Sequence, residues 1–384
     1  MRGSRAYGGK GAALVCLGLG MLAVVAVVAI RSATSQAASP AVSAKNLAEA
    51  NRVVKSFSGT PAPVTSGVTT PVSHPVPRGK LIVQVTPGAP SANINDRGLE
   101  LGAKLLGWKV KTFYLGTTAD TFQQAFNSAV AAKPDAVWVS TVDPATWTKF
   151  AKIWNKKNIP ITDQGSAKPY TRKNWYDFLT PKALGVAYKP FGDWVISDAK
   201  GKKTGVLVVN IPAIQVFKPA ATYIESRIKQ LCPSCATQTL NVNLANIGTT
   251  IPGQVTGVLQ KNPDLKYIVF TLGDLATGVP EALKSAGVTG VKIATAAAGP
   301  GVLSELKKGS VAMDLALENA WHAMPPLDFS ARHLSHSSTA PSKKWTSNVQ
   351  FLYPNSKFDP NKPYSAHPTA QVLAAWKKLW TAKK

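Results

Sequence analysis

Two cysteines in the order Cys-Pro-Ser-Cys, Cys232 and Cys235, have the spacing that most directly suggests chemistry. A pair with this spacing at the N-terminus of a helix exchanges disulfides, because its thiol pKa is lowered there. Here the pair follows the helix predicted over residues 216–231, so it lies at the opposite end of a helix. If the chain is exported to an oxidising compartment, as its N-terminus indicates, we expect a structural disulfide that closes a tight loop. Zinc would need two more ligands, and no second such pair exists, so no metal site is predicted.

The familiar signatures of catalysis and of phosphate or dinucleotide binding are missing from the sequence. It contains no Gly-x-Ser-x-Gly, no His-Glu-x-x-His, no P-loop and no Gly-x-Gly-x-x-Gly after a predicted strand. His333 and His336 share one helix face but lack an acidic partner. We therefore predict a protein that is not an enzyme and that carries no cofactor.

Several polar or aromatic side chains stand where predicted strands end. Carboxylates and amides at such places can hydrogen-bond a ligand's hydroxyl or ammonium groups, and an aromatic ring can stack on a sugar or ring-shaped ligand. These residues are candidate ligand contacts. They are Ser91, Asn93, Asp143, Asp163, Gln164, Phe217, Lys218 and Asp274.

A structural role explains several of these candidates equally well. Asp143 precedes a proline and can cap the helix predicted over residues 145–157. Asp274 can cap the helix that follows it, while Phe217 and Lys218 can simply begin a surface helix. The sequence leaves both interpretations open.

The elements that position these residues alternate between β-branched runs and amphipathic stretches of helical length. Strands are predicted at 81–85, 108–115, 135–140 and 159–163, and again at 204–210, 237–242, 267–272 and 291–295. Helices are predicted at 95–106, 120–132, 145–157, 183–199, 216–231, 250–261 and 275–286. This alternation is typical of parallel sheets covered on both faces, and two such sets predict an α/β fold with two doubly wound lobes. Ligands bind at the carboxyl ends of such strands, so facing lobes would bring the candidates to one cleft.

The N-terminus has the features of an export segment. Three basic residues precede an uninterrupted apolar run, residues 12–30, and no acidic residue accompanies them. Residues 1–37 are predicted to be either a cleaved signal peptide or an uncleaved membrane anchor, because the run is almost long enough to span a bilayer. Either outcome places the rest of the chain outside the cytoplasm, at the cell surface or in the periplasm.

Residues 38–78 divide into a short helix, predicted over 43–57, and a Pro/Ser/Thr/Gly tract that ends at Gly79. A tract of this composition is not expected to build a core, so we predict an extended tether.

The chain is strongly basic, because 44 Lys and Arg against 19 Asp and Glu give a formal net charge of +25. Removal of residues 1–37 leaves +21, since four cations and no acid are lost. Attraction to anionic wall polymers, to lipid head groups or to an acidic ligand accounts for this charge, and so does a purely compositional origin. Nucleic acid is not an expected partner of an exported chain without a recognised reading motif.

Four stretches of the chain resemble one protein family. They are GLELGAKLLGWKVKTF (98–113), PDAVWVSTVDPATW (134–147), NIPITDQGS (158–166) and NPDLKYIVFTLGDLATGVPEALKSAG (262–287). With these motifs in this order, the chain from about Gly79 to Val349 resembles the type I periplasmic solute-binding proteins of the ribose or sugar-binding class, the receptors of ABC importers. The short helix, the Pro-rich tract and the start of the next strand resemble actinobacterial members.

This resemblance implies two lobes joined by a three-strand hinge, with crossings near Thr180–Pro181, Leu315–Asn319 and Trp345–Val349. Lobe 1 would comprise residues 79–180 and 319–345, lobe 2 residues 181–318, and residues 346–384 a hinge return and a basic C-terminal helix. Glu318 and Asn319, at the second crossing, become further candidate ligand contacts. The lobes would rotate around a bound ligand, and a monomer is expected.

The resemblance also implies a function. The chain would capture a small polar ligand, sugar-like by default, and deliver it to an ABC permease; a ligand sensor or a wall-associated binding protein not coupled to transport is the alternative. Two loops, PGAPSANIN (87–95) and TAAAG (295–299), depart from the sugar-binding pattern, and Phe217–Lys218 stand near the position of an arginine in relatives. A site that has lost hydrogen-bonding groups for hydroxyls loses selectivity among sugars, so the sequence does not name the ligand.

Overall fold

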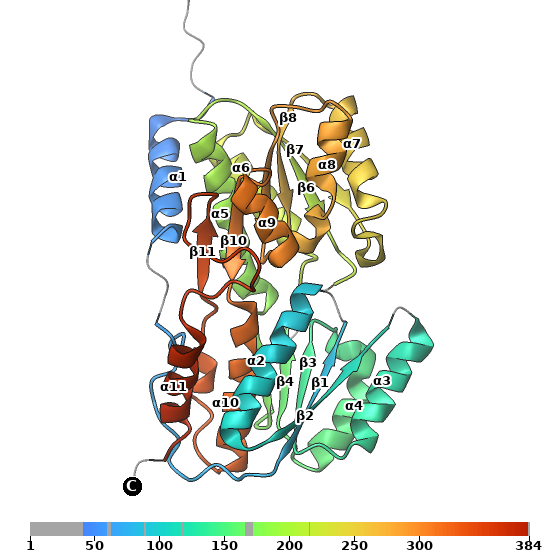
Figure 1. The fold of residues 1–384 in the computed structure, drawn as a ribbon, viewed down its shortest axis with the longest axis vertical. Coiled ribbons are helices and arrows are strands. Elements are labelled where there is room, and N and C mark those ends of the chain that lie inside the picture. The colour runs from blue at the N-terminus through green and yellow to red at the C-terminus, as the bar shows by residue number, and fades with distance from the viewer. Residues whose placement is uncertain are drawn as a thin grey trace, which may run out of the picture. The chain divides into compact units, whose positions relative to one another are not determined.

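The structure is a computed structural model that describes residues 41–59, 63–87, 90–116, 118–165, 172–214 and 216–382 (Figure 1). The predicted signal peptide or anchor, residues 1–37, lies outside these ranges. Within them, no helix combines the length and the apolar character needed to cross a bilayer.

Lobe 1 is built on a five-stranded parallel sheet in the order β2-β1-β3-β4-β5. The strands are β1 (Leu81–Thr86), β2 (Lys109–Tyr114), β3 (Ala136–Ser140), β4 (Ile161–Gln164) and β5 (Trp175–Phe178). The central strand β3 is buried along its whole length, as expected of a strand covered on both faces.

Helices cover both faces of this sheet (Figure 1). They are α2 (Pro90–Leu106), α3 (Ala119–Ala131), α4 (Pro144–Lys156), α10 (Met324–Leu334) and α11 (Thr369–Leu379). Alternation along β3 divides the core: Trp138 packs with residues of α2, α10 and α11, whereas Val137 and Val139 pack with residues of α3 and α4. Tertiary packing on both faces fixes these short strands in place.

Lobe 2 is built on a six-stranded sheet in the order β11-β10-β9-β8-β6-β7. The strands are β6 (Gly205–Asn210), β7 (Ala236–Asn241), β8 (Leu265–Phe270), β9 (Lys292–Ala296), β10 (Met313–Leu317) and β11 (Val349–Leu352). The helices α5 (Pro181–Asp198) and α6 (Ala220–Leu231) cover one face, and α7 (Ile251–Lys261), α8 (Val279–Ser285) and α9 (Pro300–Lys308) cover the other.

The predicted fold class, two α/β lobes with parallel sheets, is confirmed. Three strands were not predicted, namely β5, β10 and β11. The edge strand β11 pairs antiparallel with β10, so the sheet of lobe 2 is mixed rather than purely parallel.

The N-terminal segment is packed against both lobes, which corrects the prediction of an extended tether. Helix α1 (Ala44–Phe57) lies against α5 of lobe 2, with Ala50 fully buried between them (Figure 1). The tract that follows runs over lobe 1, where Val68 and Val72 are 1% and 2% exposed. Val72 also donates its backbone N–H to the carbonyl of Leu379 at 2.8 Å. Buried valines and backbone hydrogen bonds therefore hold this tract on lobe 1, although its composition predicts a solvent-exposed segment.

The chain passes between the lobes from β5 to α5, from β10 to α10, and in the segment before β11. It passes between them again on both sides of this hinge. At the N-terminal side α1 lies on lobe 2 and the tract on lobe 1, and at the C-terminal side β11 belongs to lobe 2 whereas α11 packs on lobe 1.

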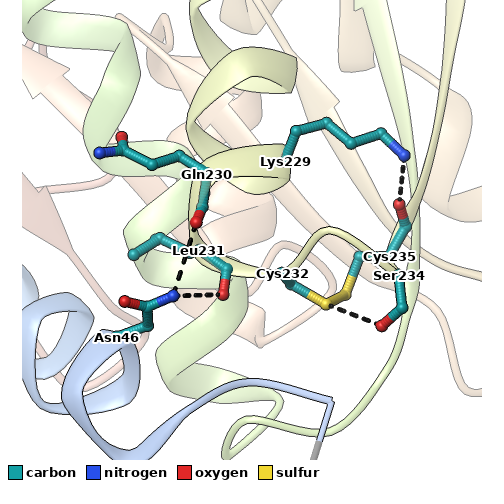
Figure 2. The surroundings of a disulfide bond; sticks show 7 residues. All are labelled: Asn46, Lys229, Gln230, Leu231, Cys232, Ser234 and Cys235. Atoms are coloured by element: carbon teal, nitrogen blue, oxygen red, sulfur yellow. Dashed lines mark hydrogen bonds between the residues drawn. A yellow bond between two sulfur atoms is a disulfide. The ribbon is translucent and has the colours of Figure 1, made fainter.

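Cys232 and Cys235 form a disulfide at the C-terminal end of α6, and both residues are fully buried (Figure 2). Lys229 donates its Nζ to the carbonyl of Cys235 at 2.9 Å. Asn46 of α1 donates its Nδ2 to the carbonyl of Leu231 at 3.0 Å, which satisfies one of the acceptors left free at a helix end. The predicted pairing and its place at the C-terminal end of a helix are thus present.

Candidate functional site

A cavity of about 90 Å³ lies between the two lobes, at the carboxyl ends of strands from both sheets. Lobe 1 lines it with Pro87, Asn95, Ser140, Thr141, Gln164 and Leu179. Lobe 2 lines it with Tyr188, Ile214, Val216, Phe217, Leu272, Ala297 and Leu317. Asn319 and His322 complete it beside the second crossing. This is the place where open parallel sheets bind ligands.

The wall from lobe 1 carries uncharged polar groups that hold one another. Ser140 donates its hydroxyl to Oε1 of Gln164 at 3.1 Å, and Thr141 donates its hydroxyl to the carbonyl of Ser140 at 2.8 Å. Asn95, on α2, is 4% exposed, and its Oδ1 has no hydrogen-bond partner among the described residues. Asn95 lines the cavity, so this oxygen is a candidate acceptor for a ligand hydrogen bond.

The wall from lobe 2 is apolar. Tyr188 extends from α5 and donates its hydroxyl to the carbonyl of Thr271, so this polar atom is already used. Burial, with a smaller contribution from Asp314, raises the pKa of Tyr188 above its ordinary value and keeps the phenol neutral. The ring of Phe217 meets the ring of Tyr188 edge-on, which fixes the orientation of both.

His322 stands at the hinge end of the cavity as a neutral ring. Burial lowers the pKa of His322 to about 4, so the imidazole carries no charge near pH 7. Its Nε2 lies 3.0 Å from the hydroxyl of Ser347, and Trp345 packs against it at a right angle. Asn319 donates its Nδ2 to the carbonyl of Ala297 at 3.4 Å across the same end.

Three lining residues other than glycine have left-handed backbone conformations. Thr141, Leu179 and Ala297 have φ values of 60°, 50° and 56°, and each directly follows a strand. Such conformations cost about 1–3 kcal/mol each and persist only where the surrounding structure imposes them. Their concentration at one cavity is typical of a binding site whose geometry is set in advance.

The structure brings three of the predicted ligand contacts to the cavity, Gln164, Phe217 and Asn319. Ser91 and Asn93 lie on α2, and their side chains are outside the description. The remaining five do not line the cavity.

The placement of these five explains why they lie elsewhere. Asp143 caps α4 by accepting the N–H of Ala145 at 2.9 Å, and Lys218 is exposed. Asp163 lies fully buried within β4, and Asp274 lies in a short 3-10 helix that is itself buried.

Glu318 belongs to the hinge rather than to the cavity wall. Its carboxylate accepts from Nδ2 of Asn348 at 2.6 Å and from the N–H of Ala366 at 2.8 Å. Both oxygens of the side chain are therefore engaged by the chain itself.

Most of the cavity wall was not predicted as ligand contacts. Ser140 is the last residue of the strand predicted over 135–140 and Thr141 directly follows it, so the rule that placed the site could have found both. Asn95 and Tyr188 lie inside helices, α2 and α5, where no signal in the sequence separates a lining residue from a core residue.

The comparisons with known proteins agree with this geometry. A family profile described as "Periplasmic binding protein domain" matches residues 92–323, more than half of the chain. No curated protein sequence matches the chain. The chain belongs to the periplasmic binding protein family, which confirms the predicted resemblance. It is an extracytoplasmic solute-binding protein rather than an enzyme.

Solved structures share the fold at low sequence identity. A glucose-galactose binding protein from Geobacillus stearothermophilus aligns with a TM-score of 0.62 and 16% identity, over 72% of this chain and 98% of that one. A solute binding protein from Agrobacterium vitis with bound allitol aligns with a TM-score of 0.60 and 21% identity, over 72% of this chain and 96% of that one. A galactofuranose binding protein aligns with a TM-score of 0.62 and 15% identity, over 78% of this chain and 100% of that one.

Proposed function

We propose that this protein captures a small uncharged solute between its lobes, outside the cytoplasm, and delivers it to an ABC importer. The observation that carries the proposal is the cavity itself, which both lobes line at the carboxyl ends of their strands. Rotation of the lobes about the crossing segments would open and close it, the hinge motion of two-lobed binding proteins. Gln164, Phe217 and Asn319 are proposed to contact the solute.

Sugars and polyols are the first solutes to test. Two of the structural relatives are named for glucose and galactose and for galactofuranose, and a third was solved with bound allitol. We also propose that residues 1–37 are a cleaved signal peptide or an uncleaved segment that anchors the protein in the membrane. The binding unit is proposed to be a monomer.

A thermal-shift screen against sugars, polyols, amino acids, nucleosides and small aromatic compounds tests the binding. A solute that binds only the folded protein raises the melting temperature, and the rise grows with the solute concentration. At a free solute concentration of one hundred times Kd, the folded state is stabilised by about 2.7 kcal/mol. Phe217→Ala should weaken binding of the solute at least tenfold, because the ring lines the cavity. Lys218→Ala, on the exposed neighbour, should leave the affinity unchanged. A flat screen across all classes would contradict solute capture.

Delivery is tested separately by uptake of the radiolabelled solute into cells that lack this protein. Uptake should fall with the deletion and return with the wild-type chain but not with Phe217→Ala. Binding in vitro with unaltered uptake would favour a sensor over a transport receptor.

A further inference from the structure

The two walls of the cavity between the lobes differ in chemistry. Every described lining residue contributed by lobe 2, from Tyr188 to Leu317, is apolar or aromatic. The wall from lobe 1 carries amide and hydroxyl groups at Asn95, Ser140, Thr141 and Gln164. A ligand enclosed here meets hydrogen-bonding groups on one side and hydrocarbon on the other.

No charged side chain occurs among the described lining residues. An ionised group that moves from water into such a site loses hydration free energy. Without a counter-charge, hydrogen bonds to neutral groups do not restore all of it. His322 is neutral near pH 7 and supplies no charge either. The described part of the lining therefore disfavours carboxylates, phosphates and amines.

The buried oxygen of Asn95 indicates what the polar side of the ligand carries. The residue is 4% exposed, and Oδ1 has no hydrogen-bond partner among the described residues. A buried acceptor without a donor costs about 1–3 kcal/mol. A ligand hydroxyl pointing at lobe 1 removes that cost.

The hydroxyl pattern of a free aldose does not suit these two walls. A pyranose carries hydroxyls around its ring, and those facing lobe 2 would be buried without partners at about 1–3 kcal/mol each.

Building on the proposed function, we propose that the solute is an uncharged alcohol or phenol with its hydroxyl groups on one edge, not a free aldose. Its hydroxyl edge would accept and donate hydrogen bonds along Asn95, Ser140 and Gln164 of lobe 1. Its hydrocarbon edge would pack on Val216, Phe217 and the other apolar residues of lobe 2. The substrate class is thus set by a one-sided distribution of polarity.

Calorimetric titration of the processed protein, or of the full chain in lipid nanodiscs where the N-terminal segment is retained, tests this class. The probes are cyclohexanol, phenol and catechol on one side and D-glucose, D-galactose and D-ribose on the other. At least one hydroxylated hydrocarbon should bind, and at least tenfold more tightly than each aldose. Tighter binding of an aldose, or no binding of the first three, overturns the inference. An aldose that binds leaves the proposed function standing, whereas failure of the wider screen removes both.

Two variants examine the walls separately. Asn95→Leu should weaken the best probe at least tenfold, while Asn241→Leu, on an exposed position of β7, should not change it. Val216→Thr places a hydroxyl on the apolar wall with little change of shape and should weaken the same probe at least threefold. Unchanged affinity in a folded Val216→Thr variant overturns the one-sided arrangement even where Asn95→Leu does not fold.

Discussion

The side chain of Asp314 lies fully buried in β10, close to the cavity but not lining it. Its Oδ1 accepts from the hydroxyl of Thr295 at 2.7 Å and from the N–H of Ala298 at 3.3 Å, while its Oδ2 has no partner among the described residues. Burial, to which the nearby Asp274 adds, raises the pKa of Asp314 to about 7. The folded protein therefore holds this carboxyl protonated at mildly acidic pH.

Asp314→Asn should change how stability depends on pH. Between about pH 4 and 7 the folded wild-type chain binds a proton that the unfolded chain has released, so its stability falls as pH rises, by about 1.4 kcal/mol per unit at most. An amide does not titrate, so the stability of the variant relative to the wild type should rise from pH 5 to about pH 7 and then level off. His322, with its lowered pKa, gives the opposite slope below pH 6.5 and cancels in this difference.

Urea denaturation of both proteins at several pH values measures the effect on Asp314. Asp264→Asn, at an exposed position, is the matched control and should follow the wild type. A constant difference between Asp314→Asn and the wild type would mean that the carboxyl is ionised in the folded state throughout.

At the scale of elements, the end of α6 depends on the loop closed by Cys232 and Cys235. A loop of four residues removes about 2 kcal/mol of conformational entropy from the unfolded chain. The double variant Cys232→Ala/Cys235→Ala should therefore unfold at lower urea, with stability reduced by about 2 kcal/mol. Both side chains are fully buried, and alanine fills less of that space, which adds to the loss.

A reducing agent provides the control for this prediction. It should lower the urea midpoint of the wild type and leave that of the double variant unchanged. A wild type that does not respond to reduction, although both thiols are freed, would show that the packing around Lys229 and Asn46 holds the loop without the bond.

The elements of this fold differ in how far the sequence predicts them. Long β-branched runs such as β6 and β8 are recognisable because a central parallel strand is buried on both faces and has few polar residues. β11 is stabilised by its partner β10, more than thirty residues earlier in the chain, which no local pattern encodes. The cavity is likewise predictable only in part. Its position follows from where the strands end. Asn95 and Tyr188 reach it from helices, and tertiary packing decides which face of a helix points to the cavity.

At the scale of the whole molecule, one buried carboxylate connects several of the segments that pass between the lobes. Glu318, at the second crossing, accepts from Asn348 at 2.6 Å, next to the third crossing. It also accepts from the N–H of Ala366 at 2.8 Å and from the hydroxyl of Ser365 at 3.2 Å, in the segment that leads to α11. Asn348 in turn accepts from the hydroxyl of Ser66 at 3.1 Å, in the N-terminal tract.

These contacts mean that the lobes do not rotate about three independent strands. The N-terminal segment, with α1 on lobe 2 and the tract on lobe 1, and the C-terminal segment, from β11 to α11, both have to move with the hinge. Glu318 is 5% exposed, so its hydrogen bonds form in a medium of low dielectric constant and are strengthened accordingly. The proposed opening of the cavity would thus involve the segments that carry α1 and α11.

Glu318→Gln should loosen this connection with almost no change in shape. An amide group has to direct N–H donors at Asn348 or at Ala366, where donors already stand, so at least one of the present hydrogen bonds is lost. Hydrogen bonds to a charged group contribute about 1.5–3 kcal/mol each, and we expect the free energy of unfolding to fall by about 2–3 kcal/mol.

Spin labels on exposed positions of α3 and α7 should also report a broader distribution of distances between the lobes without ligand. Glu305→Gln, which removes the ion pair with the exposed Lys308, should change stability by less than about 1 kcal/mol and leave that distribution unchanged. A distribution in Glu318→Gln as narrow as in the wild type would show that the crossing segments are held in register by their own packing and not by this carboxylate.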